Sequence, residues 1–127
     1  ADFAFNVLRG EPIVMSSDGS ARRAFCYASD AVAGIFTVLL KGEPALPYNV
    51  ANPAAELSVL ELAQLLVGLY PEAGLRVERR AAPDGTTYLP SAFSRLVPDV
   101  SRLSALGWQA DIGPAEGFRR MIEAYRA

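Results

Sequence analysis

The feature that most constrains the fold is the segment 31–40, which is almost entirely apolar and carries no charged side chain. Ser29 or Asp30 can cap a helix that begins here and runs to about Lys41. A helix that is apolar nearly all round is normally buried on several sides. A chain of 127 residues has little other material to cover it. We therefore expect part of this helix to stay exposed and to suit a missing neighbour or a second copy of the chain.

The composition excludes several kinds of chemistry. The chain has no histidine and a single cysteine, Cys26. An internal disulfide, a Cys-rich or His-containing metal site, and Ser-His-Asp or Cys-His catalysis are therefore excluded. A net charge of −2 argues against nucleic acid or an anionic membrane as a partner, and no apolar run is long enough to span a membrane. The lone cysteine and the lack of a secretory segment predict a cytoplasmic protein.

Local patterns predict helices interleaved with short strands. The chain is already in helical pattern at Asp2 with no capping residue before it, so we expect the sequence to begin inside or just before an element of a longer chain. Ser58 and Glu61 form a capping box, in which each side chain satisfies the other's backbone N–H, so a helix follows Ser58. The remaining predicted elements are helices at 99–106 and 114–125 and strands at 48–50 and 75–79.

A β-hairpin is predicted near the start of the chain. Residues 13–15 have the composition of a strand, residues 17–20 (Ser-Asp-Gly-Ser) that of a turn, and residues 24–28 that of a returning strand. The stretch 81–94 is irregular and long enough to suggest a working loop. The whole pattern, with short strands, a hairpin and about five helices, predicts a single α/β domain over residues 1–127.

Two stretches of the sequence carry motifs in a characteristic order. The first comprises residues 10–13 (Gly-Glu-Pro-Ile), 18–27 (Asp-Gly-Ser-Ala-Arg-Arg-Ala-Phe-Cys-Tyr) and Asp30, and the second comprises residues 94–102 (Ser-Arg-Leu-Val-Pro-Asp-Val-Ser-Arg) and 106–108 (Leu-Gly-Trp). Together with the Tyr-Asn-Val segment and the Ser58 helix between them, they resemble the carboxy-terminal half of extended short-chain dehydrogenases. These NAD-dependent epimerases and dehydratases act on nucleotide sugars and include UDP-glucuronate decarboxylases, dTDP-glucose dehydratases and UDP-sugar epimerases.

The resemblance implies a small carboxy-terminal lobe that binds a UDP- or dTDP-sugar and lacks its Rossmann half. Arg23 and Arg95 match the two arginines that contact the substrate diphosphate in this family. Two guanidinium forks can hold a diphosphate through paired, charge-assisted hydrogen bonds that lysine cannot copy. Spacing alone favours the interpretation that both are ordinary surface arginines, and the family pattern reverses that interpretation.

The resemblance also implies that one segment passes beside the nucleotide base. This segment consists of Ile13, Val14, Met15 and Ser16. Relatives often have Tyr-Gly where this chain has Ser16 and Ser17, so an aromatic contact with the base is not expected at that point.

Other motif residues have simpler structural interpretations. We expect Asp30 and Asp99 to cap helices, and Asn49 either to cap a turn or to lie at a strand end near the junction of the two lobes. We expect no ligand role for the two aspartates or for three aromatic residues assigned to the core, namely Phe25, Tyr27 and Trp108.

The catalytic features of the family are missing from this sequence. The family uses a Tyr-x-x-x-Lys pair, but the residue four before Lys41, the only lysine, is Thr37. No two glycines have the G-x-G or G-x-x-G spacing that holds the phosphates of NAD. We therefore expect NAD to bind the rest of a larger enzyme and this chain to be inactive alone. The alternative is a stand-alone nucleotide-binding or protein-interaction module.

Overall fold

The computed structural model describes residues 2–80 and 93–126, and within them it confirms the predicted α/β class. The predicted loop at 81–94 lies almost wholly outside the described residues. The described helices are α1 (Asp2–Arg9), α2 (Ala28–Lys41), α3 (Val59–Leu69), α4 (Ser101–Ala105) and α5 (Pro114–Arg126). The described strands are β1 (Ile13–Met15), β2 (Arg22–Ala24), β3 (Glu56–Ser58), β4 (Val77–Arg79) and β5 (Arg95–Leu96).

The predicted hairpin is wrong, because β1 and β2 belong to different sheets. β1 pairs in parallel with β4, whereas β2 lies between antiparallel β3 and parallel β5. The turn that was expected to reverse the chain instead packs on the start of α3, where the Gly19 carbonyl accepts a hydrogen bond from the Leu60 amide at 3.0 Å. Gly19 has φ +73°, and a Cβ there would lie 2.9 Å from that of Leu60. Because Gly19 packs against Leu60 in this way, the chain continues from the sheet of β1 to the sheet of β2 instead of forming a hairpin.

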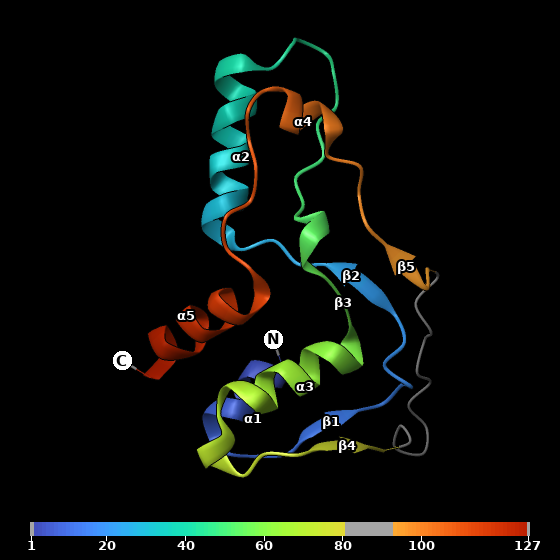
Figure 1. Cartoon of the computed structure of the whole chain (residues 1–127), viewed down its shortest axis with the longest axis vertical. Coiled ribbons are helices and arrows are strands. Elements are labelled where there is room, and N and C mark those ends of the chain that lie inside the picture. Colours follow the sequence, from blue (N-terminus) through green and yellow to red (C-terminus); the bar gives the residue numbers. More distant parts are fainter. Residues whose placement is uncertain (1, 81–92, 127) are drawn as a thin grey trace.

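One core lies where α1, α3 and α5 pack beside β1, in the lower half of Figure 1. The apolar faces of these elements and the connection from α3 to β4 supply its buried side chains, which are Ala4, Val7, Ile13, Met15, Leu62, Ala63, Leu66, Tyr70, Leu75 and Ile122. The capping box at the start of α3 is confirmed: the Glu61 amide donates to Ser58 Oγ at 3.0 Å, and the Ser58 amide donates to Glu61 Oε2 at 2.6 Å.

A second packing centre lies between α2 and α4. The buried Trp108 donates from Nε1 to the carbonyl of Asp30 at 3.0 Å. Gly34 brings α2 close to this group, because a Cβ at Gly34 would lie 3.1–3.3 Å from Val50, Trp108 and Leu103. Trp108 is therefore a core residue, as predicted.

The predicted caps of α2 are wrong. Tyr27 occupies the N-cap position of α2 and makes no side-chain cap bond. Asp30 lies inside the first turn, where its buried carboxylate accepts a hydrogen bond from the Ile112 amide at 2.9 Å. Ile112 is 82 residues away in the sequence. A long-range contact thus takes the side chain that local pattern assigned to a cap. The N-cap of α4 is Val100 rather than the predicted Asp99, although the Asp99 carboxylate does accept a hydrogen bond from the Ser101 amide at 2.9 Å.

The predicted strand at 48–50 is also wrong, since no described strand pairs with this segment. The side chains here bind neighbouring backbone instead. Asn49 donates from Nδ2 to the Asp99 carbonyl at 2.9 Å, and the Tyr48 hydroxyl accepts from the Glu43 amide at 3.0 Å.

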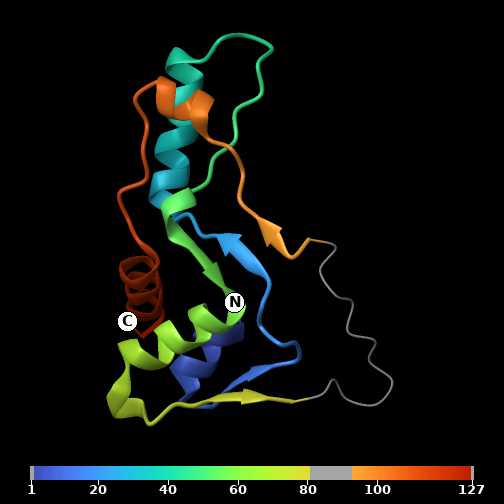
Figure 2. The same ribbon diagram turned by 45° about the vertical axis from the view of Figure 1, so that its right-hand side comes forward.

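One face of α2 is exposed, as its apolar composition predicted. Figures 1 and 2 both show this helix at the outer end of the molecule, with only α4 and connecting segments beside it. We call this surface the α2 face, and it consists of Val32 (50% exposed), Ile35 (59%), Phe36 (56%), Leu39 (74%) and Leu40 (79%).

Candidate functional site

The two motif arginines come from neighbouring strands, although about seventy residues separate them in the sequence. β2 carries Arg23, β5 carries Arg95, and the two strands pair in parallel. The register aligns Arg22 with Arg95 and Arg23 with Leu96. Because side chains alternate between the faces of a sheet, Arg23 and Arg95 leave it on opposite faces. The structure therefore brings the two motif segments together without aligning the two predicted side chains.

Arg95 lies in a compact group of charges that we call the Glu56 cluster, made of Arg22, Glu56, Glu61 and Arg95. Arg95 binds Glu56 with two parallel bonds of 2.8 Å, from Nε to Oε1 and from Nη2 to Oε2. Arg22 donates from Nε to the same Oε1 at 2.8 Å, and its Nη1 lies 3.0 Å from Glu61 Oε2. Two guanidinium groups and two carboxylates balance, so the cluster carries no net charge.

The arginines perturb the acid–base behaviour of the carboxylate between them. The hydrogen bonds from Arg95, and then those from Arg22, lower the pKa of Glu56 from 4.5 to about 2. The bonds to Glu56 in turn raise the pKa of both arginines. Glu56 is therefore ionised throughout the physiological range. Sequence reasoning missed Glu56, because a single glutamate three residues before a helix carries no motif.

Arg23 is partly buried and binds backbone carbonyls. Its Nη1 donates to the Arg22 carbonyl at 2.6 Å, and its Nη2 donates to the Phe93 carbonyl at 3.2 Å. Arg23 thus connects β2 to the segment that leads into β5. A guanidinium tied to backbone by its terminal nitrogens has a restricted orientation, which is a property useful for binding an anion.

The predicted base-contacting segment is β1 with the residue after it. Ile13 and Met15 are 0% and 5% exposed and belong to the core, so their side chains cannot reach a ligand. Val14 is partly buried and Ser16 is exposed. Within this segment only these two side chains and the backbone are left to contact a base.

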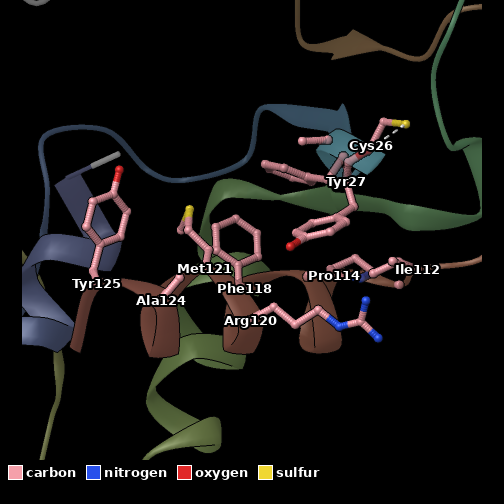
Figure 3. A pocket seen from close by; sticks show the side chains of 13 residues that line it. Cys26, Tyr27, Ile112, Pro114, Phe118, Arg120, Met121, Ala124 and Tyr125 are labelled. Atoms are coloured by element: carbon pink, nitrogen blue, oxygen red, sulfur yellow. Dashed lines mark hydrogen bonds between the residues drawn. The ribbon is translucent and has the colours of Figure 1, made fainter. Parts of the chain in front are cut away.

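A pocket of about 460 Å³ lies between α5 and the residues that connect β2 to α2. Its lining is apolar and aromatic except for Arg120, whose guanidinium lies 6.0 Å from the Tyr27 ring centroid and binds Glu116 at 2.7 Å. Figure 3 shows Tyr27 lying over α5, whereas Cys26 points away from this helix. Sequence reasoning assigned Tyr27 to the core, but it is only partly buried and lines this pocket. One paired cation does not suit the pocket to a diphosphate.

No group of three or more His, Cys, Asp or Glu side chains in the described residues is arranged to hold a metal ion. In the same residues, no helix is both long and apolar enough to cross a membrane.

Comparisons with known proteins connect these motifs to a family. The model of the NAD dependent epimerase/dehydratase family matches residues 1–51. The chain is 34% identical over 108 residues to dTDP-D-glucose 4,6-dehydratase of Mus musculus, an alignment that covers 85% of this chain. It is 30% identical over 128 residues to UDP-glucuronic acid decarboxylase 6 of Arabidopsis thaliana, which covers 99% of this chain. The chain is therefore similar to these two enzymes along most of its length and to the NAD dependent epimerase/dehydratase family over residues 1–51.

Solved structures of such enzymes have the same fold. UDP-glucose 4-epimerase of Thermotoga maritima, solved with UDP-glucose, superimposes on 98% of the chain with a TM-score of 0.78 at 22% identity. The Bordetella bronchiseptica enzyme WbmF, solved with NAD+ and UDP, superimposes on 98% with a TM-score of 0.71 at 25% identity. This chain spans 30% and 34% of the two sequence relatives and 38% and 34% of the two solved chains, about one third of each.

Proposed function

We propose that this chain is a single domain that binds the nucleotide sugar for an NAD-dependent epimerase, dehydratase or decarboxylase. The observation that carries the proposal is the pairing of β2 with β5, which joins the two arginine-bearing motif segments in one sheet. The relatives act on dTDP- and UDP-sugars by name. Their common chemical feature is a pyrimidine nucleoside diphosphate, and this is the ligand class that we assign to the site.

The diphosphate would lie at the edge of the β2–β5 pair. Arg23 and Arg95 would bind it from the two faces of the sheet, each through charge-assisted hydrogen bonds. The base would lie against β1, where Val14, Ser16 and the backbone are the groups available. Arginine is suited to this task because its planar fork binds two phosphate oxygens at once.

This chain would supply substrate binding and no catalysis. The family resemblance implies that NAD takes a hydride from a sugar carbon and later returns a hydride to the sugar. The sequence offers neither a Tyr-x-x-x-Lys pair nor a glycine-rich phosphate loop for this chemistry. We assign the cofactor and the catalytic residues to a Rossmann domain outside these 127 residues.

Titration calorimetry with UDP and dTDP tests the proposal. We expect weak binding to the wild-type chain, a lower but measurable affinity with Arg23→Ala or Arg95→Ala alone, and no detectable heat with the double variant. Arg76→Ala is the matched control, because Arg76 is an exposed arginine paired with Glu78 at 2.7 Å outside the β2–β5 pair. Wild-type affinity in the double variant would overturn the proposal.

The α2 face supports a second candidate function, a protein-interaction module without nucleotide binding. Its five exposed apolar side chains form the kind of surface that marks a contact site. The calorimetric titration separates the two functions. A chain that associates through this face and binds neither UDP nor dTDP would favour the interaction module.

A further inference from the structure

We propose that Glu56 is an internal counter-ion that holds Arg95 until a nucleotide binds, and that it then releases Arg95 to the nucleotide diphosphate while keeping Arg22. This role rests on the proposed function and concerns how that same site is regulated. Arg95 would exchange one bidentate anion for another when the ligand binds, so Glu56 and the diphosphate compete for the same guanidinium edge.

The geometry of the Glu56 cluster makes Arg95 the replaceable partner. The Arg95 side chain is 61% exposed, and within the described residues both of its side-chain hydrogen bonds go to Glu56. Arg22 is 38% exposed and is fixed from three points, by the Glu56 carboxylate, by Glu61, and by the Glu56 carbonyl at 3.5 Å. If the Arg95 side chain moved away from Glu56, Arg22 would therefore keep its position.

The free-energy cost of this exchange is small because Glu56 keeps a cationic partner. Glu56 is only 19% exposed, and a carboxylate at that depth needs a cation. Arg22 would still provide one after Arg95 leaves, so no uncompensated charge results. An ion pair whose arginine is mostly exposed adds little stability, because water competes for both partners. A diphosphate with two phosphoryl groups can therefore displace the carboxylate from Arg95.

The exchange predicts that substituting Glu56 strengthens nucleotide binding, whereas substituting a residue of a binding site usually weakens it. Glu56→Gln keeps the shape of the side chain but removes the competing negative charge. We expect UDP to bind this variant roughly fivefold or more tightly than wild type, at the lower end of typical couplings between two binding events. The gain should vanish in an Arg95→Ala background, since no guanidinium is then freed.

The control is a carboxylate with two arginines elsewhere in the chain. Glu116 on α5 also binds two arginines, with one hydrogen bond from Arg119 to Oε2 and one from Arg120 to Oε1. Glu116→Gln should leave the UDP affinity unchanged, which separates competition for Arg95 from a general loss of negative charge. A second measurement needs no variant: in NMR spectra of the wild-type chain, UDP should shift the side-chain Nε–H signal of Arg95 much more than that of Arg22.

The outcomes distinguish this role from the proposed function. If wild type binds UDP but Glu56→Gln binds it equally or more weakly, the carboxylate positions Arg95 and the exchange is wrong. An Arg95 signal that does not move with bound UDP would also overturn it, even if Glu56→Gln failed to fold. If the wild-type chain bound no UDP at all, the proposed function would fail first, and the role of Glu56 with it.

Discussion

At the scale of single residues, Gly34 shows how closely α2 packs on its neighbours. A Cβ at this position would lie 3.1–3.3 Å from Val50, Trp108 and Leu103. We expect Gly34→Leu to lower the free energy of unfolding by about 1–3 kcal/mol, because the added side chain overpacks this contact. Urea denaturation measures the change. Gly68→Ala on α3 is the control, since nothing lies within 4 Å of its Cβ, and it should stabilise the chain by about 0.5–1 kcal/mol.

Glu56 gives a residue-scale prediction for acid stability. The pKa of Glu56 is about 2 in the folded chain and 4.5 when the side chain has no contacts, as in the unfolded chain. The ionised carboxylate therefore favours folding, and this contribution is fully present above pH 4.5. That contribution is lost as the pH falls from 4.5 towards 2. We therefore expect the stability difference between wild type and Glu56→Gln to be present at pH 6 and to shrink as the pH approaches 2.

Unfolding curves recorded at several pH values check this prediction. Other carboxyl groups, including those of Glu61, Glu78 and Glu116, also have lowered pKa values. They contribute to the acid dependence of both proteins, so only the difference between wild type and variant reports on Glu56. A difference that stayed constant from pH 6 to pH 2 would contradict the ion-pair geometry.

At the scale of elements, the starts of α2 and α3 make a matched comparison. Ser58 caps α3 through its hydroxyl and is buried, so Ser58→Ala should cost about 1 kcal/mol of unfolding free energy. The sequence offers Ser29 or Asp30 as the cap of α2, but α2 has no side-chain cap bond. Ser29→Ala should therefore change stability by less than about 0.5 kcal/mol. Equal losses at both positions would mean that α2 is capped after all.

At the scale of the whole molecule, the α2 face predicts self-association. No described element covers it, and it presents five large apolar side chains to solvent. We propose that the Rossmann domain of a complete enzyme covers this face and that the chain alone associates through it. Light scattering should show a mass that rises with concentration, and Leu39→Glu should shift the chain towards a monomer.

Gln109→Glu controls for the added charge in that experiment, because Gln109 is exposed and lies outside α2. This variant should associate as wild type does. A wild-type chain that stayed monomeric at high concentration, or a Leu39→Glu variant that associated equally well, would show that the α2 face is not the contact surface.

The sequence by itself determined those features that depend on neighbours within one or two helical turns. The Ser58–Glu61 box, the extents of α3 and α5, and the uncovered apolar helix all follow from contacts or periodicities of a few residues. The motif order also pointed to Arg23 and Arg95, whose strands pair in the structure. Their role as ligand contacts remains a prediction.

Only the tertiary structure decided the features that depend on distant partners. Local pattern joined β1 to β2, but Gly19 packs against Leu60, and each strand finds partners far along the chain. Asp30 binds an amide 82 residues away, and Arg95 binds Glu56 at a separation of 39 residues. A local turn or cap contributes little free energy to the fold. Burial and charge pairing between remote segments therefore decide the structure where they conflict with the local pattern. Those long-range contacts, and no local pattern, make Glu56 part of the site.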